Sequence, residues 1–337
     1  MKVTLLGSDC FSIYALKGLI RWQAMTRNTF TVITIDRHNN PIHGFCKDNN
    51  IDCQSIDLKK KFKFITANTI SENNHYLIAC SFGMMVPGEY LDKFNGRAFV
   101  FHPSILPLYR GCSPISAALS NGDKETEVSL VEMSKGKFDA GDILDCRKVS
   151  INPLWTYSDL RLKLGEITSE FIPESMININ QLIDNKKPQG KAPVGQDQAP
   201  KLISLNAHLF PSQLTAKEFC NKFRGLSRSS IGNVYISDCN NRRLYIKEVD
   251  TYSNPSSNES LYMLNLDSGS IIPRANGNGL WLKCKDSEVL LIDYYLGSKG
   301  NLSSSQTTEL LYRPIGSKKT LKALKLATSN ISLPIFK

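Results

Sequence analysis

The segment FHPSILPLYRG, residues 101–111, closes an apolar run that begins at Arg97 and opens a loop punctuated by proline. It therefore places His102 where a strand ends. A second segment, FDAGDIL at residues 138–144, puts Asp139 in a glycine-containing turn between two strand-like runs. Histidine exchanges a proton near neutral pH, and a neighbouring carboxylate can orient it and stabilise its charge. His102 and Asp139 are therefore candidates for an acid–base pair.

Around these segments the first half of the chain alternates between strand-like and helical patterns. The expected strands are Val3 to Leu6, Phe30 to Ile35, Tyr76 to Cys80 and Arg97 to Phe101. The expected helices are Ser12 to Trp22, His43 to Asn49, Lys61 to Ser71 and a long stretch, in one part or two, from Leu154 to Leu182. This rhythm predicts an α/β fold with a Rossmann-like, mostly parallel sheet.

The residue composition changes after residue 184. Residues 185–196 are polar and rich in proline and glycine, as in a linker. Beyond them we expect a helix from Leu214 to Leu226 and an exposed loop from Asn254 to Glu259. Short alternating runs at 234–237, 244–249, 279–284 and 289–295 predict a small antiparallel barrel of the OB-like kind. The expected organisation is a catalytic domain over 1–184, a linker over 185–208 and a basic C-terminal domain over 209–337.

The composition of the chain restricts the kinds of binding partner that we expect. The net charge is +10, and residues 201–337 hold 18 Lys and Arg against 10 Asp and Glu. Such a domain fits a polyanionic partner, although a merely basic soluble surface would have the same composition. No apolar run approaches the roughly 20 residues that span a bilayer, so we expect no membrane partner. The nine cysteines are scattered without a C-x-x-C pair, which argues against structural zinc and a disulfide framework.

Known cofactor motifs are missing from the sequence. No G-x-G-x-x-G follows the first expected strand, and there is no phosphate-binding G-x-x-x-x-G-K-[ST], G-x-S-x-G elbow or His/Cys cluster. What remains is a metal-free acid–base site. Taken singly, each residue has a plainer explanation: His102 could close a strand, Asp139 could serve the turn beside Gly141, and Arg110 could be solvated.

Taken together, the motifs resemble those of the folate-dependent formyltransferases and, within them, the methionyl-tRNA formyltransferases. The resemblance rests on Gly7-Ser8 with Phe11-Ser12, Ser81-Phe82-Gly83 with Val86-Pro87, His102 to Pro107 with Arg110-Gly111 and Pro114-Ile115, and Asp139 to Leu144. In the second half it rests on Gln198 to Lys201 and Asn221 to Leu226, in the domain that distinguishes the tRNA enzymes from the shorter glycinamide ribonucleotide formyltransferases.

This resemblance implies transfer of the formyl group of 10-formyltetrahydrofolate to the amino group of methionyl initiator tRNA, for translation initiation. His102 and Asp139 would be the catalytic residues. The folate cosubstrate would be lined by Ser104, Ile105, Leu106 and Pro107. The tRNA would be contacted by Arg37, Arg110, Lys222 and Arg224. No metal is implied, and we expect a monomer.

The chain departs from the family pattern at two places. The family has an asparagine two residues before the histidine, where this chain has Val100; that amide is expected to stabilise the oxyanion. A longer basic loop is also expected after Ile35-Asp36-Arg37, but here the chain runs through His38 to Pro41 into the next helix. Recognition of the initiator acceptor end is therefore expected to differ.

Three alternatives remain open at this point. A formyltetrahydrofolate hydrolase and a sugar-amine N-formyltransferase would use the same catalytic domain, although the basic C-terminal domain argues against both. A degenerate, non-catalytic tRNA- or folate-binding protein would explain Val100. Because formylated initiators belong to bacteria and organelles, we expect a mitochondrial matrix protein of the fungal type, although Met1 to Gly7 is already strand-like and no presequence is visible.

Overall fold

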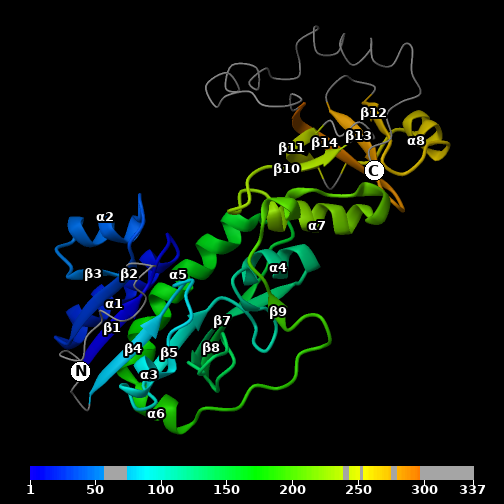
Figure 1. Ribbon diagram of the computed structural model, residues 1–337. Helices are drawn as coiled ribbons and strands as arrows, with labels where there is room; N and C mark the ends of the chain where they lie inside the picture. Colours follow the sequence, from blue (N-terminus) through cyan, green and yellow to red (C-terminus); the bar gives the residue numbers. More distant parts are fainter. Residues whose placement is uncertain (57–73, 238–242, 251–252, 275–278, 297–337) are drawn as a thin grey trace. The chain divides into compact units, whose positions relative to one another are not determined.

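The computed structural model of the chain describes residues 1–56, 74–237, 243–250, 253–274 and 279–296. It forms two compact units (Figure 1). Unit 1 comprises Met1–Ala118 and Asp123–Lys201, and unit 2 comprises Leu119–Gly122 and Leu202–Lys337. The predicted helix at Lys61 to Ser71 lies outside the described residues. None of the helices in the described part is long and apolar enough to cross a bilayer.

Unit 1 is built on a seven-stranded sheet of order β3-β2-β1-β4-β5-β7-β8. The first five strands in this order are mutually parallel, and β7 and β8 extend the sheet in antiparallel fashion. The strands are β1 (Lys2–Leu6), β2 (Thr29–Ile35), β3 (Cys53–Ile56), β4 (His75–Ala79), β5 (Ala98–His102), β7 (Glu125–Glu132) and β8 (Ile143–Ser150). The predicted Rossmann-like, mostly parallel sheet is confirmed.

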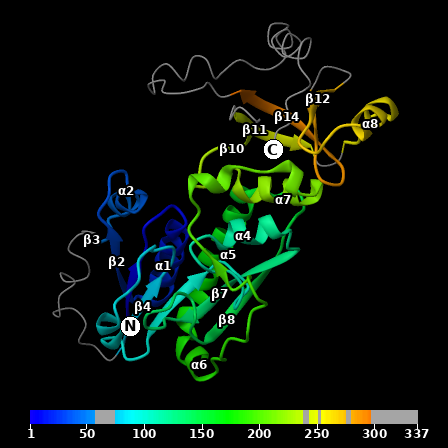
Figure 2. The same cartoon turned by 45° about the vertical axis from the view of Figure 1, so that its right-hand side comes forward.

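Helices α1 (Ser12–Thr26) and α5 (Tyr157–Ile177) pack together against this sheet (Figures 1 and 2). A Cβ atom at Gly165 of α5 would lie 2.5 Å from the ring of Tyr14, so the contact requires glycine there. The Phe171 ring of α5 meets Phe101 of β5 edge to face, with ring centroids 5.4 Å apart. Because side chains alternate along a strand, Val100 and His102 point to the other face of the sheet.

That other face is covered by an apolar cluster that includes Phe82, Tyr90, Leu91 and Phe94. Tyr90 and Leu91 lie on α3 (Gly88–Asp92). The other described helices of unit 1 are α2 (Pro41–Asp48), α4 (Pro114–Asn121) and α6 (Ile179–Asp184). The end of α4, from Leu119 onward, is grouped with unit 2. The long predicted helix over 154–182 is thus divided into α5 and α6.

The segment after α6 is tied closely to unit 1. We call residues 186–199 the strap. Its Lys187 exchanges backbone hydrogen bonds with Ile143 of β8, at 2.8 and 2.9 Å. Its end, β9 (Gln198–Ala199), pairs in parallel with β6 (Arg110–Gly111). The strap therefore pairs with two separate segments of unit 1, and the linker over 185–208 remains a prediction.

Unit 2 contains a five-stranded antiparallel sheet of order β10-β11-β14-β13-β12, in agreement with the predicted OB-like architecture. The strands are β10 (Val234–Ser237), β11 (Arg243–Asp250), β12 (Ile271–Pro273), β13 (Leu280–Lys283) and β14 (Glu288–Leu296). Its core includes Phe219 and Phe223 of helix α7 (Ala216–Leu226). Two single 3₁₀ turns, η2 (Ser204–Ala207) and η3 (Pro211–Gln213), precede α7.

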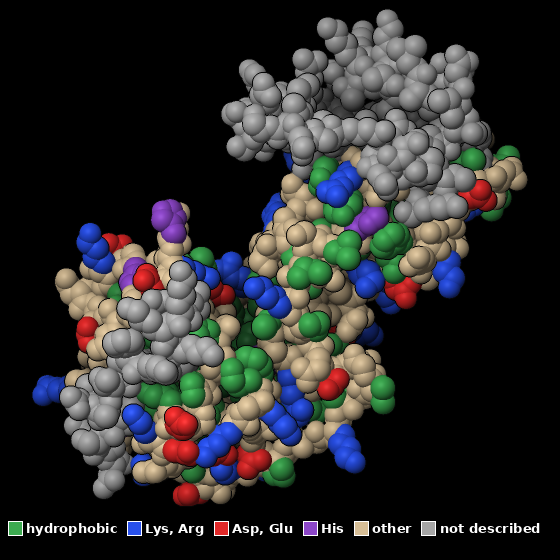
Figure 3. Space-filling view, in the orientation of Figure 1, with side chains coloured by type: hydrophobic (Ala, Val, Ile, Leu, Met, Phe, Trp, Pro, Cys, Tyr) green, Lys and Arg blue, Asp and Glu red, His purple; other side chains and the backbone are tan. Residues whose placement is uncertain are grey.

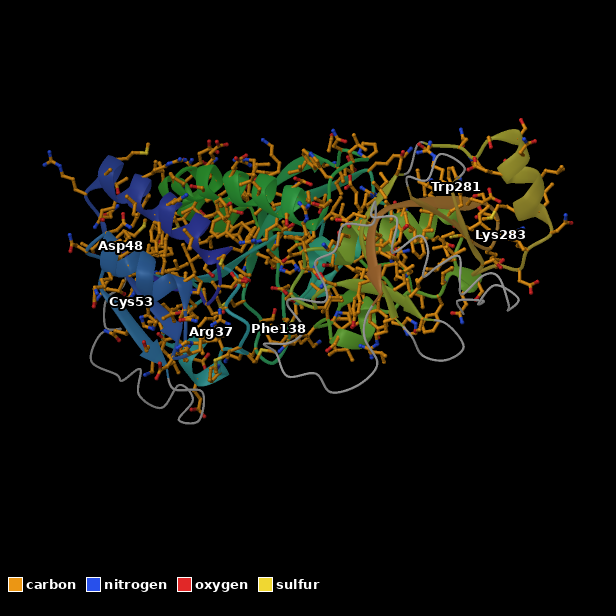
Figure 4. All side chains as sticks on the ribbon, turned by 90° about the horizontal axis from the view of Figure 1, so that it is seen from above. Arg37, Asp48, Cys53, Phe138, Trp281 and Lys283 are labelled. Carbon is orange, nitrogen blue, oxygen red and sulfur yellow. The ribbon has the colours of Figure 1, made fainter. Side chains whose placement is uncertain are left out.

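The predicted loop at Asn254 to Glu259 is wrong for its second half. Ser256 caps a helix, α8 (Ser257–Leu264), and forms a reciprocal capping box with Glu259. Each of the two groups satisfies an otherwise unpaired N–H of the first turn, which stabilises the helix start. Lys283 of β13 donates to the carbonyl of Met263 near the other end of α8 (Figure 4).

Candidate active site

His102 ends β5 at the carboxyl edge of the parallel sheet, the edge at which open α/β folds bind their ligands. Its side chain is 6% exposed. The imidazole Nε2 lies 3.0 Å from the carbonyl oxygen of Tyr109, and Nδ1 lies 3.5 Å from Oδ2 of Asp139. The structure therefore brings together the two residues that the sequence placed 37 positions apart.

Asp139 lies in the connection between β7 and β8 and is also buried. Its backbone is left-handed, with φ +49°, a conformation that disfavours a non-glycine residue by about 1 kcal/mol. The N–H of Gly111 donates to the same Oδ2 that faces His102, at 2.9 Å. A Cβ atom at Gly141 would overlap the carbonyl oxygen of Glu132, so the turn needs glycine two residues after Asp139.

The hydrogen bonds determine how His102 carries its proton. A carbonyl oxygen only accepts, so Nε2 must donate to Tyr109. In the neutral ring Nδ1 then holds the lone pair, and this nitrogen faces the Asp139 carboxylate. Protonation at Nδ1 would create an imidazolium that donates to both Tyr109 and Asp139. Nδ1 is therefore the ring nitrogen at which a proton can be taken up, and it lies beside Oδ2 of Asp139.

The position of Tyr109 is itself fixed from outside the motif. Its hydroxyl donates to Oδ2 of Asp123 at 2.8 Å, and its backbone N–H donates to the carbonyl of Gln196 in the strap. Tyr109 is buried, and its backbone adopts the left-handed conformation, with φ +60°. Burial raises the pKa of Asp123 above its ordinary value, while the hydrogen bond from Tyr109 acts in the opposite direction.

The four residues predicted to line the folate site follow His102 in one tight loop. Ser104 is fully buried; its hydroxyl donates to Leu108, and its carbonyl accepts from Ser129 of β7. Leu106 is also buried and is joined to Pro107 by a cis peptide bond. Ile105 and Pro107 are half-buried and so present the accessible side of the loop.

The residues predicted to contact tRNA are in different settings. Arg37 is exposed after β2, and its Nη2 donates to the carbonyl of Ser8. Figure 4 shows Arg37 and Phe138 along the same margin of unit 1. Arg110 is half-buried, with its guanidinium on Gln189. Lys222 and Arg224 lie half-buried on α7, where Arg224 donates to Asn221.

Sequence reasoning missed Gln189. Its side chain accepts from Arg110 and donates to the carbonyls of Asp139 and Gly141. It lies in the segment that was interpreted as a linker, where no periodic pattern or motif marks it. Tyr109 and Asp123 were missed as well, because their contacts depend on a loop conformation that composition does not predict.

Val100 occupies the place expected for the family asparagine. It is half-buried on β5, pairs with Ala79 of β4 and Val131 of β7, and faces the same side of the sheet as His102. Asn95 lies in a turn before β5 begins, at the opposite edge of the sheet. The four residue steps from Ala98 to His102 span about 13 Å, so Asn95 does not reach the His102 end.

In the described part of the chain, no three His, Cys, Asp or Glu side chains are grouped so as to hold a metal ion. The site chemistry supported by the described residues is that of a buried imidazole–carboxylate pair at a ligand-binding edge. Such a pair can move a proton during attack by an amine on a carbonyl compound.

Comparison with known proteins agrees with this chemistry. Residues 38–176 match the family described as formyl transferase. The matched segment includes both His102 and Asp139. A protein named methionyl-tRNA formyltransferase from Malacoplasma penetrans is 25% identical over 310 residues, covering 88% of this chain and 90% of the relative. One from Orientia tsutsugamushi is 26% identical, covering 91% and 95%.

Other proteins are similar to this chain over less of their length or in fold alone. The methionyl-tRNA formyltransferase of Mycoplasmopsis pulmonis is 35% identical over 152 residues, which is 45% of this chain and 52% of that protein. Among solved structures, a sugar N-formyltransferase from a Shewanella species has a TM-score of 0.58 at 16% identity, covering 75% of this chain and 99% of that one. The solved structure shares the fold of this chain, while the matched segment and the named relatives support a transferase enzyme.

A second solved structure carries ligands in its description. The N-formyltransferase of Helicobacter canadensis, in complex with folinic acid and dTDP-3-aminofucose, has a TM-score of 0.58 at 15% identity and covers 88% of this chain and 100% of that one. At this identity the likeness concerns the fold.

Proposed function

We propose that the chain transfers the formyl group of 10-formyltetrahydrofolate to the amino group of methionyl initiator tRNA. The observation that carries the proposal is the buried pair of His102 and Asp139, with Nδ1 and Oδ2 3.5 Å apart at the carboxyl edge of the sheet. Relatives named methionyl-tRNA formyltransferase that align with 88–91% of this chain support the choice of acceptor.

In the proposed reaction the amino nitrogen of methionine forms a bond to the formyl carbon, and the bond from that carbon to N10 of the folate breaks. The amine loses one proton and N10 gains one, so atoms and charge balance. His102 accepts the amine proton at Nδ1 and then gives it up as N10 is protonated, while Nε2 continues to donate to Tyr109. Asp139 stabilises the resulting imidazolium, since its Oδ2 is held in place by the N–H of Gly111.

The folate would lie against the loop from Ser104 to Pro107. The buried Ser104 and Leu106 shape this loop from inside, and the half-buried Ile105 and Pro107 offer apolar surface for a flat ring system. Apolar walls with few polar groups are typical of sites for small cosubstrates.

The tRNA would contact basic side chains. Arg37, Lys222 and Arg224 are the candidates that lie at least partly at the surface, and contacts of this kind position a nucleic acid through its phosphates. Arg110 belongs to the same prediction, although its guanidinium already binds Gln189.

We further propose that the protein works as a monomer in the mitochondrial matrix, where initiator tRNA is formylated. Imaging of a C-terminally tagged chain beside a matrix marker tests the location.

A second candidate function is binding without catalysis, and Val100 favours it. The expected amide donor for the oxyanion is replaced by a side chain that cannot donate. Loss of one such donor typically lowers the rate by about 10² to 10³. A chain of this kind would bind charged tRNA or folate but form little product.

The deciding experiment is formylation of charged initiator tRNA by the purified protein with 10-formyltetrahydrofolate. We expect turnover by the native chain and a decrease of about 10²-fold or more for His102→Ala and Asp139→Asn. His43→Ala is the control, because His43 lies on α2 and binds Ser55. If tRNA binds but neither the native chain nor any variant forms product, the non-catalytic alternative is correct.

The same assay separates the other enzymes of this fold. Release of tetrahydrofolate without any acceptor would indicate a hydrolase. Product formed only when an amino sugar nucleotide replaces the tRNA would indicate a sugar N-formyltransferase. Either result would contradict the proposed acceptor while leaving the role of His102 open to the same substitutions.

A further inference from the structure

Gln189 joins the two loops that carry the candidate catalytic residues. Its amide oxygen accepts from Nε and Nη2 of Arg110, at 3.0 and 2.6 Å. Its amide nitrogen donates to the carbonyl oxygens of Asp139 and Gly141, at 2.8 and 2.7 Å. A guanidinium only donates and carbonyls only accept, so the amide fits in one orientation and uses both of its donors.

The two loops come from different parts of the sheet. Arg110 follows β5, whereas Asp139 and Gly141 belong to the connection between β7 and β8. At Asp139, Gln189 holds the main chain while the carboxylate of the same residue faces His102 and Gly111. Since the left-handed backbone of Asp139 is intrinsically unfavourable, hydrogen bonds from outside the turn are needed to maintain it.

The strap fixes Gln189 from both sides. Before it, Lys187 pairs with Ile143 of β8. After it, the carbonyls of Gln196 and Asp197 accept from the N–H groups of Tyr109 and Arg110, each at 3.0 Å. The Gln189 side chain is therefore delivered by a backbone that is anchored to both loops, a support that a residue in a free linker would not have.

We propose that Gln189 is a positioning residue that holds the Asp139 turn against the Arg110 loop, so that the Asp139 carboxylate stays within reach of Nδ1 of His102. The proposal rests on the proposed formyl transfer, because Gln189 acts through His102 and Asp139. It also gives Arg110 a role within unit 1, which is to orient the Gln189 amide so that its NH₂ group faces the two carbonyls.

The test is the near-isosteric change Gln189→Glu. A carboxylate still accepts from Arg110, but it cannot donate to the carbonyls of Asp139 and Gly141. We expect kcat for formylation to fall by about 10- to 100-fold, because small displacements of catalytic groups have effects of this size. The KM values of both substrates should change less than about 3-fold, since the proposed role of Gln189 is exerted through Asp139 and not through a substrate.

The matched control is Gln196→Glu, the same substitution in the same strap. The Gln196 side chain is exposed, and only its backbone carbonyl binds Tyr109. We expect native kcat and KM for this variant. A thermal midpoint of Gln189→Glu that falls together with equal losses in kcat and folate affinity would indicate a general structural role and overturn the proposal.

A second readout does not depend on turnover. The chain has five histidines, so the imidazole ¹⁵N resonances can be resolved, and His102→Gln assigns that of His102. We expect Gln189→Glu to shift the His102 resonance and Gln196→Glu to leave it unchanged. An unchanged His102 resonance in Gln189→Glu would overturn the positioning role, even if the native chain proved inactive and the proposed function failed on its own.

Discussion

At the scale of single residues, Val100 stands where the resemblance to formyltransferases leads us to expect an asparagine. The structure places this side chain on the same face of β5 as His102, two residues earlier and among apolar neighbours. Nothing about β5 itself prevents an amide there, because Val100 is half-buried at the end of the sheet where the ligand is expected. The replacement therefore concerns chemistry more than folding.

We expect Val100→Asn to raise the single-turnover rate of formylation by up to about 10²-fold, the reciprocal of what removal of one oxyanion donor does. Val100→Ala is the control, since it removes the valine without adding a donor. A rate for Val100→Asn no higher than that of the native chain would mean that another donor already serves the oxyanion. Rapid quench with radiolabelled methionyl-tRNA measures both rates.

Asp123 gives a pH-dependent prediction at the same scale. Burial raises the pKa of its carboxyl above the ordinary 3.8. The folded state therefore holds this proton more tightly than the unfolded state, and stability contributed by the group falls as pH rises from 3.8 through the raised value. The substitution Asp123→Asn introduces an amide that cannot titrate, and the amide oxygen can still accept from Tyr109.

We expect the Asp123→Asn variant to gain stability relative to the native chain as pH rises through that window, and to differ least at its acidic end. Denaturant unfolding of both proteins at several pH values gives the difference directly. Tyr109→Phe is the companion variant, because it removes the hydrogen bond but leaves Asp123 titrating. A difference between Asp123→Asn and the native chain that does not change with pH would contradict the assignment.

The sequence selects His102 and Asp139 as candidates, but it does not predict the residues that contact them. Each of the two has a plainer explanation when taken singly, and they could be selected because their motifs together resemble those of the formyltransferases. Gln189, Tyr109 and Asp123 could not, since their roles come from left-handed backbone at residues 109 and 139 and from pairing of the strap. Both features depend on contacts between segments far apart in the chain.

At the scale of elements, the connection between β7 and β8 contains two glycines that are needed for different reasons. Gly141 has no room for a Cβ atom, because the carbonyl of Glu132 at the end of β7 occupies that space. Gly136, in the same connection, has open space but a φ of +70°. One position is limited by packing and the other by backbone conformation.

We expect Gly141→Ala to displace the Asp139 turn and lower kcat by about 10-fold or more. Gly136→Ala should lower stability by about 1 kcal/mol, the usual effect of a left-handed alanine, and leave kcat near the native value. Kinetics and denaturant unfolding on the two variants distinguish the effects. Equal kcat for both would show that the turn tolerates movement of Asp139.

Strands and helices were predictable where the pattern was long and local. The continuous apolar run at Tyr76 to Cys80 became the central strand β4, all of whose residues are buried. The start of α8 was misjudged as a loop because polar residues dominate it, although Ser256 and Glu259 have the S-x-x-E spacing of a capping box. The pairing of the strap could not be predicted, since its partners are remote in sequence.

At the scale of the whole molecule, the positive charge is concentrated near the end of the chain. Residues 1–200 hold 23 Lys and Arg against 21 Asp and Glu, and blue and red side chains are interspersed over the visible face of unit 1 (Figure 3). Residues 201–296 hold 11 against 9, whereas residues 297–337, outside the described part, hold seven against one. The basic character predicted for the C-terminal domain therefore belongs mostly to its last 41 residues.

This distribution predicts which charges make tRNA binding sensitive to salt. Neutralising a phosphate releases a counterion, so the logarithm of the affinity falls with the logarithm of salt concentration, by roughly 0.7 to 0.9 per contact. We expect simultaneous alanine substitution of Lys318, Lys319, Lys322 and Lys325 to weaken tRNA binding and to reduce this slope by about 1 to 3. The control removes the same charge from exposed lysines of unit 1, at Lys17, Lys47, Lys93 and Lys148. Fluorescence anisotropy between about 50 and 200 mM salt measures both slopes. An equal reduction of the slope in the two variants would mean that the overall charge of the protein, rather than the position of the charges in the chain, attracts the tRNA.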